Sequence, residues 1–558
     1  MDSQFKENYQ LEMSEKRTCQ PCLPAGRPDR QARKRRKKKA SKPVFKKYEQ
    51  NQMNLLPQNL DEIIVEKHLV RVLNKTIDRL NISPLVETYK GGGASSYHPL
   101  MLLKVLLYAY LNKIYSSRMI AKALRENIYF MWLSGNNQPD FRTINDFRLR
   151  LTGVVEEIFV SMILFLSEHK YIELEKYFLD GSKFRADAKK TSYVWKKNTE
   201  RYKESVQQRV KELLKQIEEI NQDEEKRYGN KDLPEMGEDS LISSEEIKER
   251  ANQISEKIKE KTKLTTAKQS KQEVKTTEKL LKRIEKEIPK LEKYDHQEEK
   301  LNGRNSYSHT DNDATFFQMK NKELIPAYSV QIGTEKQYIL NYSIHQQASD
   351  SVLLKTHIEK YRRMFGHYPN LISTDSGYGN EENYEYLENN GIKNYLKYNT
   401  FHYETTKPYQ ENPYHKDHLL YNETEDGYQC PRGRKLKFKE ERKTKTKTGF
   451  EQTVRIYESE NCRRCPLSKK CRKGKGKRTI QVNRNLDYYR KQARENLTTE
   501  KGYELRRQRN IDVEPVFGDI KYNQGYQRFR LRGLKKVNVE MGLLSIAHNI
   551  KKLALEIN

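Results

Sequence analysis

Long apolar segments are absent from this chain of 558 residues. No stretch of about 18 uncharged apolar residues occurs, and a membrane-spanning helix needs roughly that length. The first residues, MDSQFKENYQ, have no apolar core of the kind that secretory signal peptides carry. We therefore expect a soluble, intracellular protein. Its length allows three or more domains with at least one sizeable core.

Cysteine is scarce, with six residues in the whole chain. In an intracellular protein, cysteines are more often metal ligands or free thiols than disulfides. A Pro-Arg-Gly turn follows Cys430, and Cys462, Cys465 and Cys471 cluster downstream. Four thiolates in this grouping predict a zinc site that holds together an otherwise coreless, lysine-rich segment. The spacing departs from two paired CxxC motifs, so reduced cysteines without a metal are the alternative.

Acidic residues are outnumbered by basic ones. The chain has 77 Asp and Glu against 107 Lys and Arg, which gives a formal net charge of +30. Such an excess indicates a polyanionic partner, and double-stranded DNA is the natural one. A composition rich in Lys, Asn, Tyr and Ile, as an A+T-rich genome produces, is the other explanation. The charge supports DNA binding without proving it.

Residues 1–45 are polar and contain an unbroken basic run from Arg33 to Lys39. We predict a disordered basic arm that makes weak contact with DNA phosphates, with a solvated tail as the alternative. Cys19 and Cys22 form a lone CxxC in this segment, which is a weak signal for a metal.

Apolar residues recur at helical spacing from about residue 60 to 150, which predicts an all-α domain at residues 46–165. Two short helices are expected at 116–135 and 138–151, around a turn of Gly, Asn and Pro. This pattern resembles a helix-turn-helix and predicts DNA contacts by Arg142 and Arg148. A purely structural helical bundle is the alternative.

Three acidic residues border apolar segments that are far apart in the chain: Asp180 in YFLDGSKF, Asp375 in LISTDSGYG and Glu514 in DVEPVFGDIK. An acid at the end of a buried strand is costly unless it is paired or binds a metal. Hard divalent cations prefer carboxylate oxygens, and phosphodiester chemistry uses two such cations. The pattern predicts a metal-binding nuclease triad.

The alternation around the first two acids predicts an α/β catalytic domain at residues 166–399 and 481–558. After the strand that carries Asp180, strands are expected at 325–334 and 337–346, a helix at 349–366, a strand that delivers Asp375, a short helix at 383–391 and a strand at 393–399. Two segments interrupt this domain. Residues 196–300 carry heptad-like apolar stripes, which predict an antiparallel helical hairpin or coiled coil. Residues 400–480 hold the cysteines.

The third acid is expected on a helix around DVEPVFGDIKYNQG, with Asp512 as its cap and Pro515 in its first turn. Glu514 and Lys521 are seven residues apart and share a face of such a helix. Lys521 is therefore predicted to hold a phosphate, with an exposed charge pair as the alternative. A mixed basic and aromatic segment follows, suited to gripping DNA, and its predicted contacts are Arg528, Arg530 and Arg532.

The chain resembles bacterial insertion-sequence transposases of the DDE, ribonuclease H-like superfamily. The resemblance runs from about residue 48 to the C-terminus. It rests on FLDGSKFRADA, SYSHTDNDATF, TDSGYGNEENYEYL and the closing block from RNIDVEPVFGDIK to SIAHNIKKL. It implies that Asp180, Asp375 and Glu514 bind magnesium, for which manganese can substitute, and that Lys521 matches a lysine of many relatives.

The resemblance also implies a ribonuclease H-like α/β core that carries the helical insert, the cysteine-bearing insert and the all-α N-terminal domain. It implies binding of element ends, hydrolysis of a phosphodiester and joining of the freed 3′-hydroxyl to target DNA. A homodimer in the bacterial cytoplasm, near the nucleoid, is expected. The family places a Tyr, two residues and an Arg before the Glu; Tyr503 and Arg506 fit that spacing, and Arg506 is a predicted DNA contact. Arg509 is a near match to the next spacing.

Two alternatives stay open from the sequence. One is a catalytically inactive or domesticated DNA-binding protein, against which the intact acids argue. The other is a nuclease of the same fold that cuts without joining, and short inverted repeats beside the gene would argue against it. Three further acids, Asp187, Asp311 and Asp313, are not expected to be metal ligands.

Overall fold

The computed structural model describes residues 59–557, with gaps at 90–95, 229–242, 265–267, 320, 473 and 475. The predicted basic arm, with Cys19 and Cys22, and the first residues of the predicted helical domain lie outside the described residues. Residues Asn59–Asn558 form one compact unit. In the part of the chain that the structure describes, no helix is both long and apolar enough to cross a membrane.

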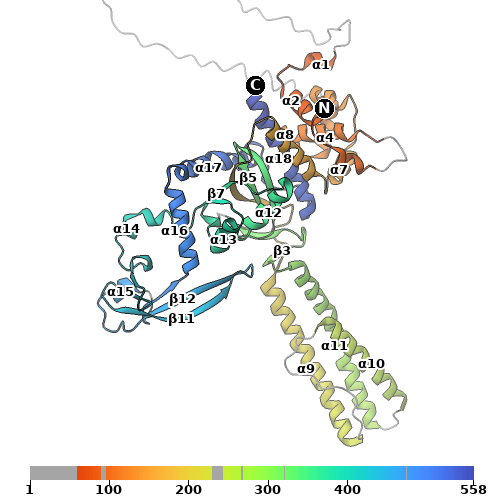
Figure 1. The fold of residues 1–558 in the computed structure, drawn as a ribbon. Coiled ribbons are helices and arrows are strands. Elements are labelled where there is room, and N and C mark those ends of the chain that lie inside the picture. The colour runs from red at the N-terminus through yellow and green to blue at the C-terminus, as the bar shows by residue number, and fades with distance from the viewer. Residues whose placement is uncertain are drawn as a thin grey trace, which may run out of the picture. The chain divides into compact units, whose positions relative to one another are not determined.

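The N-terminal part of this unit is helical, as predicted (Figure 1). Gly135 ends the sixth helix in the left-handed conformation, with φ at 55°. Asp140 then caps the seventh helix, because its side chain accepts a hydrogen bond from the Thr143 backbone N–H (2.7 Å). The expected turn of Gly, Asn and Pro therefore separates these two helices. The single helix expected at 116–135 is instead two helices, α5 (Ser117–Glu126) and α6 (Ile128–Ser134), because Asn127 caps α6 by accepting from the Tyr129 backbone N–H (2.9 Å). The helices are α1 (Leu60–Ile63), α2 (Leu69–Asp78), α3 (Ser83–Glu87), α4 (Pro99–Leu111), α5 (Ser117–Glu126), α6 (Ile128–Ser134), α7 (Phe141–Arg150) and α8 (Val155–Glu168).

A mixed sheet forms the centre of the unit, with six strands among the described residues. Strand β1 pairs antiparallel with β5 and parallel with β7, and β7 pairs parallel with β8. Along its other edge, β5 pairs antiparallel with β4 and β6. Every residue of β5 after its first is buried. The strands are β1 (Lys176–Arg185), β4 (Thr315–Gln318), β5 (Leu324–Glu335), β6 (Tyr338–His345), β7 (Leu371–Thr374) and β8 (Lys393–Leu396).

The predicted strands and helices of this region are confirmed. Helix α12 (Leu354–Phe365) connects β6 to β7, and α13 (Glu381–Asn389) connects β7 to β8. Their apolar spacing and the short apolar runs of the strands were enough to place them from sequence.

Helix α18 (Leu534–Ile557) joins the sheet to the N-terminal helices, since it packs against β6 and also against α2, α4 and α8. A single hydrophobic cluster therefore extends through both regions. Asp311 and Asp313 hold the start of α18 by accepting hydrogen bonds from the backbone N–H groups of Gly533 (3.1 Å) and Leu534 (2.7 Å).

The helical insert differs from the predicted hairpin. Its described residues form three helices, α9 (Lys196–Tyr228), α10 (Ser244–Leu264) and α11 (Lys268–Leu301), between the paired strands β2 (Tyr193–Trp195) and β3 (Ser306–Ser308) (Figure 1). Each of the three apolar stripes in the sequence belongs to its own helix. The stripes meet in one shared core, which two helices alone would not enclose. The prediction of two helices was therefore wrong.

The cysteine-bearing insert folds as an antiparallel sheet, in the order β13-β12-β11-β10-β9 among its described strands. The expectation of a coreless segment was wrong, because a small apolar cluster lies under this sheet. The strands are β9 (Leu420–Asn422), β10 (Gly427–Gln429), β11 (Lys435–Lys445), β12 (Glu451–Ser459) and β13 (Thr479–Val482). The buried members of the cluster are Leu419, Leu436, Tyr457, Ile480 and Val482.

Helices α16 (Arg484–Thr498) and α17 (Glu500–Gly518) return the chain to the central sheet. The predicted start of the second helix was wrong: Thr499 caps it by accepting from the Gly502 N–H (3.0 Å), so Asp512 and Pro515 lie inside it. Pro515 cannot donate to the carbonyl of Ile511, four residues earlier.

The turn between β5 and β6 compensates for the break at the proline. Gln337 Nε2 donates to the Ile511 carbonyl (2.9 Å), and the Gln337 backbone N–H donates to Asp512 Oδ1 (3.0 Å). The π-helical turn η5 (Asp519–Asn523) follows α17 directly. A proline that would weaken an isolated helix is thus tolerated because the turn supplies its missing hydrogen bond.

Replacing Asn549 with leucine should lower the stability of the sheet. Asn549 is fully buried on α18, accepts from the Ile339 backbone N–H (2.8 Å) and donates to the Ile339 carbonyl (2.9 Å). Each backbone group left without a partner costs about 1–3 kcal/mol. We expect a lower melting temperature and faster amide hydrogen exchange at Ile339. Asn523→Leu, at an exposed asparagine, is the control. Equal melting temperatures of the two variants would contradict a stabilising role for the Asn549–Ile339 hydrogen bonds.

Candidate active site

Asp180 and Asp375 lie at corresponding positions on neighbouring strands. The parallel register of β1 and β7 pairs Phe178 with Ser373, and each acid lies two residues further along its strand direction. Asp375 follows β7 and caps the short helix η2 (Ser376–Tyr378), because its Oδ1 accepts from the Gly377 N–H (3.0 Å). Two acids that are far apart in sequence therefore reach the same edge of the sheet.

Helix α17 packs against β1, β7 and β8 and adds Glu514 to this edge. The link is Arg509, whose side chain is 5% exposed. Its Nη2 lies 3.4 Å from Asp180 Oδ2, and its Nη1 lies 3.5 Å from Glu514 Oε1. The guanidinium therefore lies between two of the three predicted acids.

The electrostatics of Asp180 reflect this setting. Burial raises the pKa of Asp180 to about 6, while Arg509 and the Gly181 N–H (2.8 Å) oppose the rise. The neighbouring Asp375 and Glu514 add to it. The three predicted acids thus share one electrostatic field, and Asp180 is a partly buried carboxylate, 20% exposed, that favours a nearby cation.

A polar network lies behind Asp180, beside Gly181. A Cβ at position 181 would lie 2.4 Å from Gln331 Nε2 and 2.9 Å from Asp350 Oδ1, so a larger residue would displace this network. Gln331 Nε2 donates to Asp350 Oδ1 (2.9 Å), and Gln331 Oε1 accepts from the Tyr378 hydroxyl. Because Tyr378 belongs to η2, this network ties β5 to the turn that holds Asp375.

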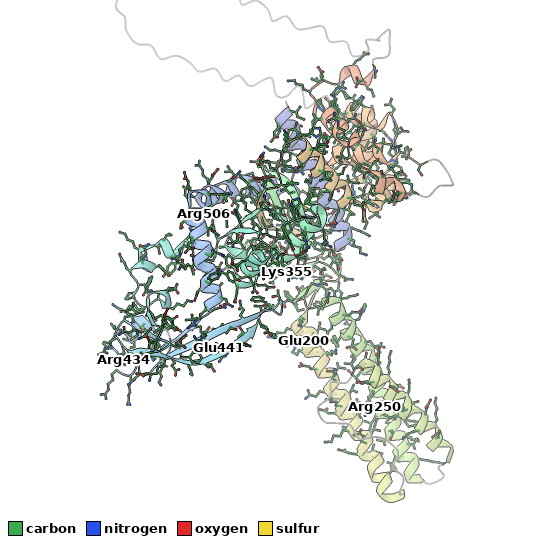
Figure 2. All side chains as sticks on the ribbon, viewed as in Figure 1. Glu200, Arg250, Lys355, Arg434, Glu441 and Arg506 are labelled. Carbon is green, nitrogen blue, oxygen red and sulfur yellow. The ribbon has the colours of Figure 1, made fainter. Side chains whose placement is uncertain are left out.

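Basic side chains surround the acids. Arg506 lies on α17 (Figure 2), with its guanidinium 5.2 Å from the Phe401 ring centre and 5.4 Å from that of Tyr503. Burial lowers the pKa of Lys397, and Arg509 and Arg506 lower it further, against the opposite effect of Asp375 and Glu514. Only a near match in the family spacing hinted at Arg509, and no sequence signal marked Lys397.

Lys521 contacts β1, the strand that carries Asp180. Its Nζ donates to Ser182 Oγ (2.5 Å) and to the Lys183 carbonyl (2.8 Å), and it lies 4.5 Å from the centre of the Phe184 ring. The lysine thus reaches β1 from η5, a few residues beyond Asp180.

The donor chemistry of the three acids fits a divalent cation, because hard cations prefer carboxylate oxygens and because Asp180 is a partly buried carboxylate influenced by both other acids. Across the described ranges, however, no three His, Cys, Asp or Glu side chains stand close enough together to form a ready metal site. Arg509 occupies the space between Asp180 and Glu514 and supplies positive charge there.

The two arginines predicted to bind DNA from the helical region differ. Arg148 is only 3% exposed, and its Nη2 donates to the Tyr115 carbonyl (2.9 Å). It also counteracts the rise that burial causes in the pKa of Glu540 on α18. The prediction that Arg148 contacts DNA is therefore replaced by a structural role. Arg142 is exposed beside Phe141.

The predicted basic segment near the C-terminus lies at the surface. Phe529 pairs with the end of β1, its N–H donating to the Arg185 carbonyl (2.9 Å). Asp187 accepts from Arg528 (2.6 Å) and Arg532 (2.8 Å), so this acid partners arginines. The exposed side chains of the segment are Arg528, Arg530 and Arg532.

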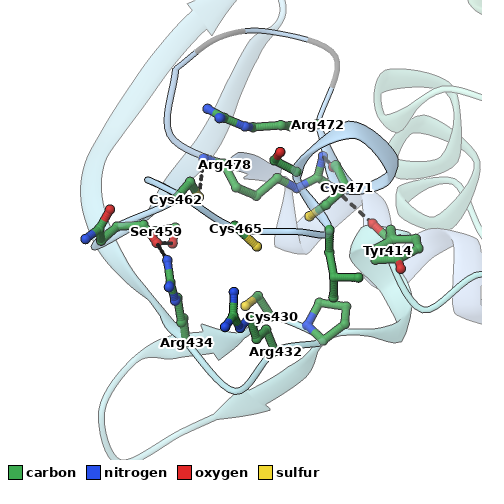
Figure 3. A pocket seen from close by; sticks show the side chains of 14 residues that line it. Tyr414, Cys430, Arg432, Arg434, Ser459, Cys462, Cys465, Cys471, Arg472 and Arg478 are labelled. Carbon is green, nitrogen blue, oxygen red and sulfur yellow. Dashed lines mark hydrogen bonds between the residues drawn. The ribbon is translucent and has the colours of Figure 1, made fainter.

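The four cysteines of the insert meet at one cavity, far in sequence from the acids (Figure 3). Burial raises the pKa of the Cys471 thiol, Arg478 opposes this, and the other three cysteines raise it further. The structure therefore brings together the thiols that the sequence predicted as a group, Cys430, Cys462, Cys465 and Cys471.

Two family models match this chain, one in its C-terminal part and one in its N-terminal helical part. Residues 429–554 match the family described as Transposase DDE domain, a range that contains Glu514, Lys521 and the cysteines. Residues 58–150 match the family described as Transposase domain (DUF772), a range that covers α1 to α7. Searches of curated proteins and of solved structures gave no match. Together, the two family matches indicate an insertion-sequence transposase of the DDE type.

Proposed function

We propose that this transposase binds the ends of its insertion sequence, cleaves phosphodiester bonds at Asp180, Asp375 and Glu514 with divalent metal ions, and joins the freed 3′-hydroxyl ends to target DNA. The observation that carries the proposal is the contact of Arg509 with both Asp180 and Glu514, together with the parallel register of β1 and β7, which sets Asp375 beside Asp180. We further propose that the chain acts as a homodimer in the bacterial cytoplasm.

The strand order supports a ribonuclease H-like core. In the order β6-β5-β1-β7-β8, β5 runs antiparallel to both of its neighbours, β6 and β1, and β7 and β8 run parallel to β1. The first acid lies on the central strand and the second at the end of its parallel neighbour. A later helix then provides the third acid, in keeping with the proposed core.

The proposed mechanism assigns a role to each side chain of the site. Two bound Mg²⁺ or Mn²⁺ ions supply activation of the attacking oxygen and stabilisation of the leaving oxygen. Asp180, Asp375 and Glu514 hold them, and Arg509 balances the negative charge of the acids when no ion is present. Lys521 and Lys397 orient the phosphate. No covalent bond to the protein is needed.

Two exposed basic surfaces are the proposed DNA contacts. On the helical part, the guanidinium groups of Arg118 and Arg142 lie 5.2 Å and 5.7 Å from the ring centre of Phe141, which is itself 37% exposed. Cations beside an exposed ring can pair with phosphates while the ring contacts a sugar or base. The second surface is the segment with Arg528, Arg530 and Arg532, beside the end of β1.

Removal of a single acid should abolish the chemistry without removing DNA binding. Purified protein would be incubated with DNA that carries the element ends, with and without Mg²⁺ or Mn²⁺, and the cut and joined products mapped. We expect Asp180→Asn and Glu514→Gln to lower the cleavage rate by about 100-fold or more. Mobility-shift assays should show that both variants still bind the ends.

Glu504→Gln is the matched control, because Glu504 is an exposed glutamate on the same helix as Glu514. It should cleave and join like the wild type. Cleavage by Asp180→Asn at the wild-type rate, or binding without cleavage by the wild type under all metal conditions, would refute the proposal.

Metal-dependent cleavage should weaken as the pH falls below about 6. Burial raises the pKa of Asp180 to about 6, and a protonated carboxyl is a poor ligand. The apparent affinity for Mg²⁺ should fall by about tenfold per pH unit below that value if one proton competes. Magnesium titrations of the cleavage rate between about pH 5 and 8 measure this. A Mg²⁺ requirement that stays constant over this range would contradict it.

The melting temperature of the metal-free protein should change with pH in the opposite direction to the cleavage rate: the contribution of Asp180 to folding stability is larger at low pH. Because the pKa of Asp180 is raised from 3.8 to about 6, its contribution to folding is fully present below 3.8 and is lost as the pH rises through about 6. Asp180→Asn should remove this pH dependence from the melting temperature of the metal-free protein.

The two arginines of α7 should respond differently to alanine substitution. Arg142→Ala should weaken DNA binding and reduce the slope of log affinity against log salt by about 1. Arg148→Ala should lower the melting temperature, because the loss of a buried hydrogen bond costs about 1–3 kcal/mol, and should leave that slope unchanged. A reduced slope in a stable Arg148→Ala protein would restore its predicted DNA contact.

A further inference from the structure

Four cysteine side chains face one cavity in the second insert (Figure 3). Cys430 follows β10, Cys462 and Cys465 lie in the loop after β12, and Cys471 ends the short helix α15 (Ser468–Cys471). The cavity has a volume of about 20 Å³. A cavity of about 10–15 Å³ already holds a water molecule, so this one has room for a single small ion.

The backbone around these cysteines turns tightly, as metal-binding loops do. The Cys430 N–H donates to the Arg434 carbonyl (2.8 Å), and the Gly433 N–H donates to the Cys430 carbonyl (2.7 Å), with Gly433 at a φ of 78° that favours glycine. On the opposite wall, the Arg478 N–H donates to Cys462 Sγ (3.3 Å). Such N–H donors stabilise a thiolate ligand.

The apolar core of the insert is small. The cluster under its sheet contains five buried apolar residues among those described, with Tyr428 and Cys430 packed beside them. A core of this size stabilises a separate segment only weakly, and small domains commonly add a metal or disulfides. The cysteines lie where the loop after β12 meets the turn between β10 and β11. A metal bound there would link these two connections of the sheet.

The charges around the cavity also suit a thiolate site. A Zn²⁺ ion with four thiolates carries a formal charge of about −2, which needs compensation when it is partly buried. Four arginines line the same cavity, and Arg478 also donates to the Cys471 carbonyl (2.6 Å). The four are Arg432, Arg434, Arg472 and Arg478.

We propose that Cys430, Cys462, Cys465 and Cys471 bind one structural zinc ion. This ion links the turn after β10 to the loop after β12 in the cysteine-bearing insert. Among the described side chains the sulfurs are not yet at the spacing of bound ligands. Zinc binding would therefore require the four sulfurs to move closer together. The four are free cysteines rather than disulfides. The proposal concerns the stability of the insert and does not depend on the proposed chemistry of the acids.

The metal content of the full-length protein tests the proposal. The protein would be purified without chelators, and zinc measured by elemental analysis together with protein concentration. We expect about one zinc per chain, released when the thiols are modified with a mercurial. Cys465→Ser and Cys430→Ser should each lower the zinc content severalfold. The control variant, with Cys19→Ser and Cys22→Ser together, should keep the wild-type content.

Two measurements on the wild type avoid relying on variants that fail to fold. Cobalt exchanged for zinc should give the thiolate charge-transfer bands and the strong d–d bands of a tetrahedral site. Chelation should speed amide hydrogen exchange in β9 to β13 while the central sheet stays protected. Absence of zinc in the wild type, zinc retained in Cys465→Ser, or a disulfide between these cysteines found by mass spectrometry would overturn the proposal. None of these readouts depends on DNA cleavage.

Discussion

The partial burial of the Asp180 carboxylate, whose side chain is 20% exposed, is the constraint on which the rest of the site depends. A negative charge that is partly removed from water is costly unless positive charge lies beside it. Burial accordingly raises the pKa of Asp180 to about 6. Arg509 provides that charge, and as a nearly buried residue it holds α17 against β1. The position of Glu514 follows from this contact, since both residues belong to the same helix. A bound cation would satisfy the same carboxylate, so Arg509 and metal ions are alternative partners of Asp180 in the proposed cycle.

The placement of α17 illustrates how tertiary contacts support a locally unfavourable sequence. Pro515, which directly follows Glu514, leaves the Ile511 carbonyl without its helical hydrogen-bond partner. Gln337, in the turn between β5 and β6, donates to that carbonyl and to Asp512. These two hydrogen bonds attach α17 to the central sheet beside Pro515. The sheet therefore determines where Glu514, the third acid, lies.

Both inserts leave the central sheet at places that do not interrupt its pairing. The three-helix insert emerges between β2 and β3, which pair with each other outside the main sheet. The cysteine-bearing insert emerges after β8, the last strand in the order of the sheet, and α16 leads back from it. Each has its own apolar cluster, separate from the large cluster shared by the sheet and the N-terminal helices. The small size of the cluster in the second insert is the reason why a metal link would matter there.

The sequence by itself determined the local elements and the chemistry-bearing residues. Short apolar runs and helical spacing placed β5, β6, α12, β7, α13 and β8, and the apolar contexts of Asp180 and Asp375 marked them as special, because such periodicity is a property of neighbouring residues. Only the tertiary structure decided which arginine of α17 reaches the acids, that Arg148 is buried against Tyr115, that the three apolar stripes form three helices, and that α17 continues through Pro515. Each of these depends on partners far away in the chain, such as Gln337 for Pro515 or Asp180 for Arg509, and local periodicity contains no information about such pairings.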